Sequence, residues 1–385
     1  MTRILLYTGK GGVGKTSVAA ATAVLLSKKY KTLVMSTDPA HSLGDSLERE
    51  IGSEPTLISN NLYAQEVNIN DAINSHWKDL KEYLTALFQY QGLDPISADE
   101  IAILPGFDEA AYLLYINDYV SKNQFDVIVV DSAPTGESLR LLSFPEVMRW
   151  YMDKIFPISR TAAKLARPLM RPFSGIPVPN DAVFKSAETL YDQLGNIHDV
   201  LQNPDITSIR LVTNADQMSY NETKRAFTYL LLYGYPVDAV IANKIYTDDT
   251  GDFFKGWRDS QTRIVGELPD AFPDINILKS YLQNYELLGE EKLSIFGKNI
   301  YGNYDPFDVF YKGKPIEYIK KGNNTVIKIE LPHATKENLN VYNKAGELII
   351  ELKNWKRVLY LPQTMANMEP QDAELKNGYL YITLS

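Results

Sequence analysis

The order of apolar and polar positions divides the chain into two patterns. Up to about residue 295, short apolar runs alternate with segments whose apolar residues recur every three or four positions. The short runs predict buried strands at Ile4–Tyr7, Thr32–Ser36, Asp126–Val130, Ile209–Thr213 and Ala239–Ala242. Helices between them, such as the one expected around Trp77 and Leu84, complete an alternation typical of βαβ units. The pattern predicts an α/β fold with a doubly wound, mostly parallel sheet and helices on both faces.

From residue 313 onwards the pattern is all β. Strands are expected at Thr325–Leu331, Glu347–Leu352, Val358–Leu361 and Tyr379–Leu384. Asn377-Gly378 lies between two strand-like runs and suits a type I′ hairpin, which needs positive φ at both central residues. Residues 296–312 are rich in Gly, Asn and Tyr and predict a linker. We therefore expect an α/β domain over residues 1–295 and a small antiparallel sandwich over 313–385.

Composition excludes several classes of function. The 385 residues include no cysteine, which excludes disulfides, cysteine nucleophiles, iron–sulfur clusters, and zinc or other metal sites built from thiolates. The net charge of −9 makes the chain a poor general binder of nucleic acid, whose phosphates need neutralising. The uncharged run Ala226–Val237 is shorter than the ~20 residues of a spanning helix. The first residues lack the long apolar stretch of a secretory signal, so we expect a cytoplasmic protein without an integral membrane segment.

A phosphate-binding loop follows the first expected strand. Residues Gly9-Lys10-Gly11-Gly12-Val13-Gly14-Lys15-Thr16 fit the pattern G-x-x-x-x-G-K-[ST], and a helix-forming segment begins at Ser17. Glycines let backbone N–H groups turn inward around phosphate oxygens, and the helix N-terminus adds partial positive charge. Lys15 would reach the β- and γ-phosphates, and Thr16 would ligate Mg²⁺. An ordinary loop of this kind does not need Lys10, which is either a solvated residue or a second cation for a γ-phosphate, its own or a neighbouring subunit's.

Two acidic residues follow other expected strands. Asp38 follows the second strand, and Asp131 follows the apolar run that ends at Val130. An Asp that ends a strand beside such a loop is typical of the residue that anchors Mg²⁺ through its water shell. Asp38 is placed to orient the attacking water. A single Asp after a strand is more often a helix N-cap, but the three motifs in this chain order favour ATP hydrolysis.

The motifs resemble those of a known group of ATPases. The sequence GKGGVGKT resembles the deviant Walker A motif of the SIMIBI class, in which the signature lysine acts across a dimer interface. Together with the segments 36–45, 103–109 and 131–142, it is similar to the ArsA-type ATPases. These include the arsenite-pump ATPase and the guided-entry ATPase that targets tail-anchored membrane proteins. The similarity covers residues 1–295.

The resemblance implies a nucleotide site with two switch segments. It implies that Lys10, Lys15 and Asp38 are catalytic, and that Thr16 and, through water, Asp131 hold Mg²⁺. Asn243 is similar to the family's adenine-contacting Asn, and Asn after a strand is also a common turn residue. The implied nucleotide-binding residues are Gly9, Lys10, Gly11, Gly12, Val13, Gly14, Lys15, Thr16, Ser17 and Asn243. The implied switch residues are Asp38, Pro39, Asp131, Pro134 and Gly136.

The sequence departs from the family pattern in ways that narrow its function. Ser132 and Glu137 replace Thr and His of the usual second switch, D-T-A-P-T-G-H-T, so we expect coupling to a partner to differ. The pump captures arsenite or antimonite through cysteines, and the guided-entry ATPase usually closes its dimer with a C-x-x-C zinc site; this chain has no cysteine for either. The pump carries two ATPase halves and this chain one, so the resemblance implies a homodimer with two ATP molecules at its interface.

An apolar and basic segment follows the second switch. Residues 144–173 combine large apolar side chains with six cations and two acids. This segment is either a core-packed helix with a solvated cationic face or, over residues 144–185, a lid that binds hydrophobic clients. Pro157, Pro168 and Pro172 argue against a helix on a membrane surface. The candidate client-groove residues are Met148, Trp150, Met152, Ile155, Phe156, Leu165, Leu169 and Met170.

The C-terminal segment resembles the α-crystallin domain of small heat-shock proteins. The likeness lies in Ile329–Pro332, Leu339–Val341, Gly346–Ile350, Leu361-Pro362 and Asn377–Leu384. Such a module is either a stabilising appendage or a second docking surface, since edge strands offer backbone pairing. An ArsA-type domain followed by this module resembles the form found in cyanobacteria and plastids, which would place the protein in the cytoplasm or the plastid stroma.

These features lead to one functional hypothesis and two alternatives. The hypothesis is a Mg²⁺-dependent ATPase whose hydrolysis of ATP opens and closes a homodimer that binds hydrophobic or membrane-protein clients. One alternative is an ATPase subunit of an anion or metalloid transporter. The other is a nucleotide-dependent switch or scaffold with little hydrolysis.

Overall fold

The computed structural model describes most of the chain. The described residues are 2–38, 42–68, 78–90, 92–95, 107–136, 138–139, 141–145, 161, 180–322, 324–344, 347–353, 355–359, 361, 365 and 368–385. All eight candidate client-groove residues lie outside this set, as do Pro39 and Glu137 of the two switches.

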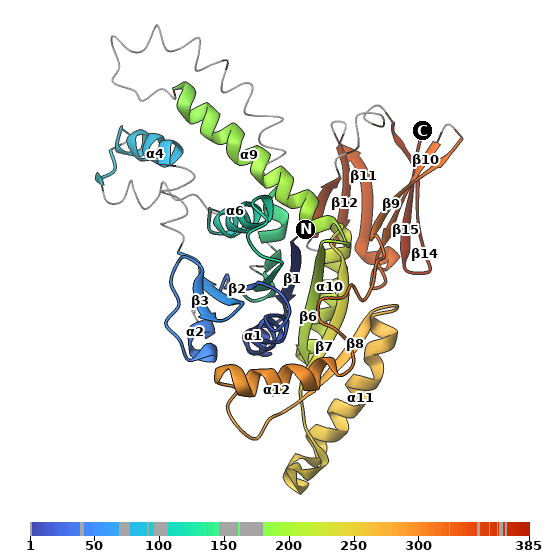
Figure 1. Ribbon diagram of the computed structural model, residues 1–385. Coiled ribbons are helices and arrows are strands. Elements are labelled where there is room, and N and C mark those ends of the chain that lie inside the picture. Colours follow the sequence, from blue (N-terminus) through green and yellow to red (C-terminus); the bar gives the residue numbers. More distant parts are fainter. Residues whose placement is uncertain are drawn as a thin grey trace.

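An eight-stranded sheet forms the centre of the larger domain (Figure 1). Its strand order is β3-β4-β2-β5-β1-β6-β7-β8, and all neighbours pair in parallel except β3 and β4. The strands are β1 (Arg3–Thr8), β2 (Thr32–Ser36), β3 (Thr56–Ser59), β4 (Leu62–Glu66), β5 (Val127–Asp131), β6 (Thr207–Asn214), β7 (Val237–Ile245) and β8 (Asn276–Tyr281). The five strands expected from apolar runs are all present, whereas the sequence pattern did not predict β3, β4 and β8.

Helices cover both faces of this sheet. They are α1 (Lys15–Leu26), α2 (Ser42–Leu47), α4 (Lys78–Tyr90), α6 (Phe107–Ser121), α9 (Asp181–Gln202), α10 (Gln217–Leu232), α11 (Lys255–Ala271) and α12 (Gly289–Tyr301). Side chains alternate across each strand, so Leu5 and Tyr7 of β1 join the core under α1, α2 and α12, while Ile4 and Leu6 join the core under α6, α9, α10 and α11. The doubly wound α/β fold is therefore confirmed. None of the described helices is long and apolar enough to cross a bilayer.

The segment expected to be a linker begins inside a helix. The sequence predicts a linker over residues 296–312, but α12 extends to Tyr301, so this expectation is wrong for its first six residues. Phe296 and Ile300 are buried against α1 and its neighbours. Gly297 marks a close helix contact, because a Cβ there would lie 2.8 Å from Leu25 Cδ1. A glycine that indicated a loop in the sequence thus serves helix packing.

Two antiparallel sheets form the smaller domain. One has the order β14-β15-β10-β9 and the other β11-β12-β13. The strands are β9 (Ile316–Lys321), β10 (Asn324–Glu330), β11 (Leu339–Lys344), β12 (Glu347–Leu352), β13 (Trp355–Leu359), β14 (Pro370–Lys376) and β15 (Tyr379–Leu384). Asn377 and Gly378 connect β14 to β15 with φ of 51° and 77°, which confirms the expected two-residue hairpin.

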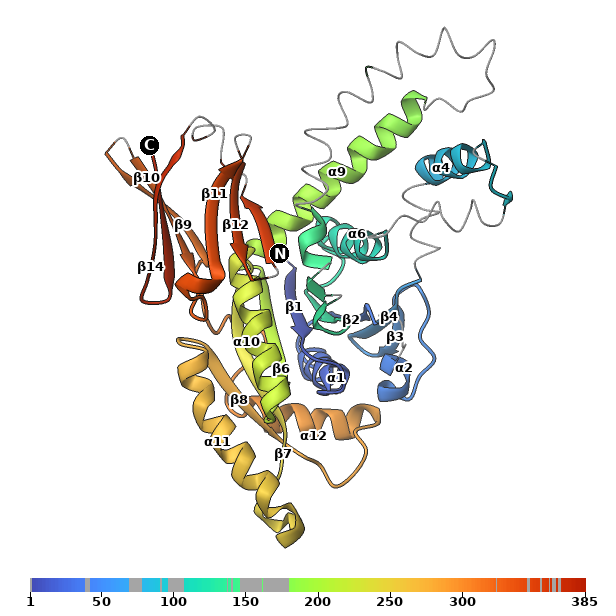
Figure 2. The same ribbon diagram turned by 180° about the vertical axis from the view of Figure 1, so that it is seen from behind.

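The smaller domain packs against α10 (Figures 1 and 2). The hydroxyl of Tyr233, just after α10, donates to the carbonyl of Lys356 at 3.1 Å. The guanidinium of Arg357 donates to the carbonyl of Leu232, the last residue of α10. Arg357 is buried, and one apolar core runs through both domains. The joint between the domains is therefore a packed interface.

Candidate nucleotide site

The glycine-rich loop lies between β1 and α1, at the carboxyl edge of the sheet. Gly9, Gly12 and Gly14 have φ of 156°, 80° and 93°, which L side chains rarely adopt. A Cβ on Gly9 would overlap the carbonyl oxygen of Val212 in β6, and one on Gly14 would lie 2.6 Å from the Asn243 amide nitrogen. Gly14 is also the N-cap of α1. The loop therefore needs glycine both for its φ angles and for its close contacts with two neighbouring strands.

The end of β7 supports the loop from the side. The Asn243 side-chain amide donates to the Val13 carbonyl at 2.8 Å, and the Lys244 ammonium donates to the Gly12 carbonyl at 2.8 Å. Asn243 is buried, and Lys244 has a φ of 56°. Asn243, expected to contact adenine, here holds the loop, and the adenine contact stays a prediction. Sequence reasoning missed Lys244, although it directly follows the Asn that was singled out.

Two lysines of the loop have different surroundings. Lys15 is buried, and its ammonium lies 3.4 Å from the Lys10 carbonyl, across the loop. The side chain of Lys10 is partly exposed. Among the residues that the structure describes, none makes a hydrogen bond or ion pair with the Lys10 ammonium. Lys15 is therefore already turned across the phosphate loop, whereas Lys10 has its charge available for another group.

Asp131 ends β5, next to the carboxyl ends of β1 and β2. It pairs in register with Tyr7 on one side and Ser36 on the other, and its side chain is 1% exposed. No described group makes a hydrogen bond of good geometry to either carboxylate oxygen. Burial raises the pKa of Asp131 to about 7, although the nearby Thr16 hydroxyl and Lys15 ammonium act to lower it, and the Asp38 carboxylate acts to raise it.

This carboxylate fits a bound Mg²⁺. A buried carboxyl group with no hydrogen-bond partner is unfavourable, and a hard cation with oxygen ligands offsets its charge. The Thr16 hydroxyl, 3.3 Å from that of Ser42, is the other oxygen ligand expected beside it. Thr16 and Asp131 therefore form a donor set of the chemical type that Mg²⁺ prefers when phosphate oxygens and water complete its shell.

Backbone hydrogen bonds tie both switch segments to the loop. Thr37 N–H donates to the Asp131 carbonyl at 2.9 Å, which fixes the start of the segment that carries Asp38. Thr135 N–H donates to the Gly9 carbonyl at 3.2 Å, which places Pro134 and Gly136 beside the loop. The Ser132 hydroxyl, where the family pattern has Thr, donates to the Tyr7 carbonyl at 2.6 Å. The structure thus brings Gly9, Lys15, Thr16, Asp38 and Asp131 to one edge of the sheet.

Comparisons with known proteins agree with this geometry. Residues 2–302 match the family model of the anion-transporting ATPase, ArsA ATPase, and residues 322–384 match the HSP20-like domain found in ArsA. A protein of Prosthecochloris vibrioformis named "Putative arsenical pump-driving ATPase" is 38% identical over 99% of this chain and 95% of its own length. "Putative arsenical pump-driving ATPase 1" of Aquifex aeolicus is 38% identical over the full length of both chains. A relative in Chlorobaculum tepidum, with the same name as the first, is also 38% identical, over 99% of this chain and 95% of its own length.

Proposed function

The chain belongs to the ArsA ATPase family and is an ATPase with a C-terminal HSP20-like domain, and we propose that it works as a homodimer whose closure depends on ATP. Opening and closing of the pair on hydrolysis would then control access to a hydrophobic or membrane-protein client. The cyanobacterial or plastid type, and the cytoplasm or stroma as location, stay predictions.

Each loop residue has a definite role in this proposal. Lys15 binds the β- and γ-phosphates, and Asp38 accepts a hydrogen bond from the attacking water and so orients it for in-line attack. Thr16 and, through water, Asp131 would hold Mg²⁺, which neutralises charge on the phosphate oxygens when bound. The partner subunit's Lys10 adds a second positive charge where negative charge spreads in the transition state.

The observation that carries the homodimer is the Lys10 ammonium, which has no bonded partner among the described residues. The loop already contains Lys15 for its own phosphates, so a second cation at the rim is suited to a nucleotide bound by a facing copy. Exposed aromatic residues at the same edge support this arrangement. Phe253 and Trp257, which follow β7, are 87% and 57% exposed. Large exposed apolar side chains are typical of a surface that a partner covers.

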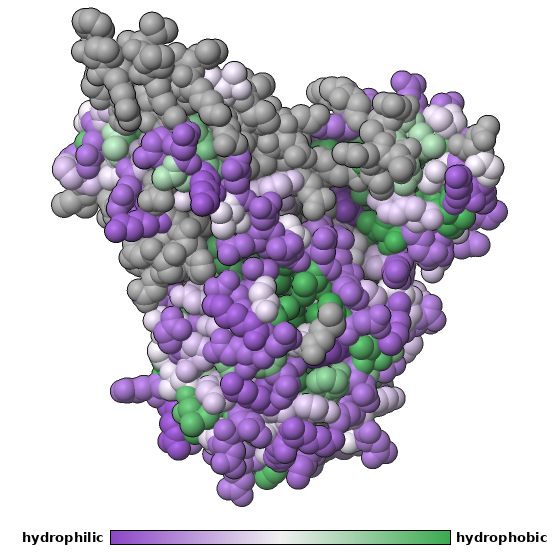
Figure 3. Space-filling view, turned by 45° about the horizontal axis from the view of Figure 1, so that its top comes forward, coloured by the Kyte–Doolittle hydropathy of each residue, from purple (hydrophilic) through white to green (hydrophobic). Residues whose placement is uncertain are grey.

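The client proposal rests on the sequence of residues 144–173, with its large apolar side chains and cationic flanks. In the described part of the chain, α4 and the start of α9 lie beyond α6, on its far side from α1 (Figures 1 and 2). On the side of the molecule seen in Figure 3, the surface of the described residues is largely hydrophilic, and some apolar residues gather near the middle of the view. The methionines and large aromatic residues in the sequence of this segment would supply the adaptable surface that varied hydrophobic helices need.

Transport is the second candidate, because the named relatives carry the term arsenical pump-driving ATPase. In this chain, capture of arsenite by thiolates is excluded, since there is no cysteine. The transport candidate predicts that arsenite or another oxyanion stimulates ATP turnover. The client candidate predicts no such stimulation.

Two measurements test the proposal. Light scattering should give a mass near that of one chain without nucleotide and near two chains with Mg²⁺ and a non-hydrolysable ATP analogue. A variant with Phe253→Ser and Trp257→Ser should dimerise less, while Tyr318→Ser, at an exposed position on β9 of the HSP20-like domain, should not change dimerisation. Persistence of the monomer with the analogue would overturn the homodimer.

The client is tested by capture. An Asp38→Asn variant should hold ATP without hydrolysing it, and should then retain proteins with hydrophobic segments when purified from the source cell. The Asp38→Asn variant combined with Lys15→Ala, which removes nucleotide binding, is the control. Recovery of the same proteins from both variants, or of none with a hydrophobic segment, would overturn the client proposal.

A further inference from the structure

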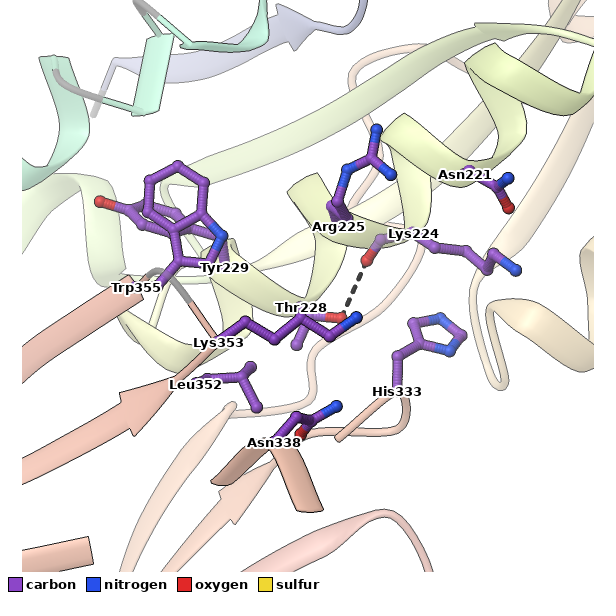
Figure 4. Close-up of a pocket in the computed structure, with 10 residues that line it drawn as sticks. All are labelled: Asn221, Lys224, Arg225, Thr228, Tyr229, His333, Asn338, Leu352, Lys353 and Trp355. Atoms are coloured by element: carbon purple, nitrogen blue, oxygen red, sulfur yellow. Dashed lines mark hydrogen bonds between the residues drawn. The ribbon is translucent and has the colours of Figure 1, made fainter. Parts of the chain in front are cut away.

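A pocket lies between α10 of the ATPase domain and the HSP20-like domain, and no residue of the phosphate loop lines it (Figure 4). Its volume is about 400 Å³, within the range of small-molecule sites. Lys224, Arg225 and Thr228 line it from one face of α10, where positions three and four apart lie together. The smaller domain supplies His333, Asn338 and Lys353. Neither domain alone forms this pocket.

The charge of the lining is positive. Its residues include Lys224, Arg225 and Lys353 and, among those that the structure describes, no Asp or Glu. Arg225 is partly neutralised by Glu222, with which it forms an exposed ion pair. The Lys224 ammonium lies 4.2 Å from the Tyr220 ring centre. Neither Lys224 nor Lys353 forms an ion pair with any residue that the structure describes. In a chain of net charge −9, two such lysines facing one cavity favour an anion.

The position of Lys353 is fixed by an uncommon backbone. It follows β12 with a φ of 54°, in the left-handed region where glycine or asparagine is usual. Its N–H donates to the Asn338 carbonyl at 2.9 Å, which ties the turn to the residue before β11. Figure 4 shows the side chain extending across the pocket toward Thr228. The turn between β12 and β13 therefore fixes where the Lys353 side chain leaves the backbone.

His333 and the aromatic wall complete the lining. Burial lowers the pKa of His333, and the charge of Lys224 lowers it further, so the imidazole is neutral at pH 7 and offers polar but uncharged contacts. Trp355 is 37% exposed at the other end, with its ring centre 4.6 Å from that of Tyr229. Leu352 also lines the pocket, on the other side of the Lys353 side chain (Figure 4). The pocket therefore combines an aromatic wall with cationic side chains.

We propose that this interdomain pocket binds a small organic anion, a phosphate or carboxylate carried on a planar apolar body. Lys224 and Lys353 bind the anionic group, the Asn338 side-chain amide donates a hydrogen bond to it, and the body lies against Trp355. Because the ligand contacts α10 and the HSP20-like domain at once, its binding stabilises their joint. The proposal does not depend on the homodimer or on a client.

The test uses the full-length protein saturated with Mg²⁺ and ADP, so that the phosphate loop is occupied. Isothermal titration with phenyl phosphate and with benzoate distinguishes a phosphate from a carboxylate as the preferred anion. At least one of the two should bind with one molecule per chain. It should bind about tenfold more tightly than inorganic phosphate or phenol, since each of these lacks one half of the ligand.

A pair of variants locates the binding. Lys224→Gln with Lys353→Gln should weaken it about tenfold or more, because charge-assisted hydrogen bonds are lost. Lys320→Gln with Lys321→Gln, exposed on β9, removes the same charge and should leave it unchanged. Both variants should keep wild-type ATP turnover, which shows that they fold. No binding of either anion up to about 10 mM, or equal weakening in both variants, would overturn the proposal.

Discussion

Burial of Asp131 disfavours the ionised form of its carboxyl group. The pKa of this carboxyl rises from 3.8 to about 7 in the folded protein, so the folded state holds a proton more tightly than the unfolded chain does. In metal-free solution, this group therefore lowers the free energy of unfolding as the pH rises from about 4 through 7. Bound Mg²⁺ would offset the cost of ionising the buried Asp131 carboxyl group, because the ion binds the carboxylate form.

Asp131→Asn tests this balance. With EDTA at pH 8, the variant should be more stable than the wild type, because a buried unpaired charge is removed. The difference in stability between the variant and the wild type should shrink at pH 5. The variant should have no ATP turnover at either pH. Urea denaturation and a turnover assay measure the two effects. Asp259→Asn, at an exposed position on α11, should change neither. Equal stability of Asp131→Asn and the wild type at pH 8 would contradict the buried charge.

The glycines of the phosphate loop differ in how much space surrounds them for a side chain. A Cβ at Gly9 would overlap the Val212 carbonyl, whereas one at Gly11 would find its nearest neighbour at 3.9 Å, on Pro134. Gly9→Ala should lose about 1–3 kcal/mol of stability and most nucleotide binding, because backbone must move. Gly11→Ala should keep the stability of the wild type. Thermal denaturation and ADP titration give the comparison, and equal behaviour of the two would contradict the close contact.

At the scale of elements, a buried ion network ties the segment after α12 to the sheet. Arg210 of β6 donates through Nε to Asp238 of β7 at 3.1 Å and through Nη2 to the Asp308 carbonyl at 3.2 Å. Arg3 of β1 donates to the Phe307 carbonyl at 3.2 Å, and Phe310 N–H donates to Asp238 at 3.2 Å. Burial is the largest single influence on the pKa of Arg210 and acts to lower it, but the charge and hydrogen bond of Asp238, together with Tyr7 and Tyr301, raise that pKa well above its usual value.

Asp238→Asn should therefore be costly. It leaves Arg3 and Arg210 buried without a counter-charge, a loss of about 3–5 kcal/mol. Asp205→Asn is the matched control, because it breaks the exposed pair with Lys312 at the end of the same segment. Exposed pairs contribute little to the free energy of unfolding. Chemical denaturation of both variants measures the contrast, and similar small losses would show that the network does not hold the segment.

The sequence predicted elements whose residues carry a strong local signal. Apolar runs gave β1, β2, β5, β6 and β7, and Asn377-Gly378 gave its hairpin, because these depend on neighbours in sequence. The hairpin of β3 and β4 was missed, since β3 is only partly buried and has no apolar run. The sequence did not predict the end of α12, because Gly297 indicated a loop. Its role in helix packing depends on contact with Leu25, which is far away in sequence. Likewise, the bond between Asn243 and Val13 depends on the order of strands in the sheet.

At the scale of the whole molecule, Arg357 connects the two domains. Its guanidinium binds the C-terminal carbonyl of α10 and lies over the Tyr233 ring, 5.2 Å from the ring centre. We expect wild-type protein to unfold in one thermal transition. Arg357→Ala should separate the HSP20-like domain into an earlier transition, because a buried helix carbonyl loses its partner. Lys356→Ala, whose backbone carbonyl still accepts from Tyr233, should keep one transition in calorimetry. A single unshifted transition in Arg357→Ala would contradict this coupling.

Action of Lys10 across the dimer is the central claim, and mixing two inactive variants tests it directly. Lys10→Ala lacks the ammonium that it would give to its partner, and Asp38→Asn lacks the group that orients water at its own site. In a mixed dimer, the Lys10→Ala chain keeps its own Asp38 and receives the partner's Lys10, so one site is complete. An equal mixture should therefore recover about a quarter of wild-type ATP turnover, since half the dimers are mixed and each has one working site. Recovery of no turnover above that of either variant alone, in a mixture shown to exchange subunits, would contradict action of Lys10 across the interface.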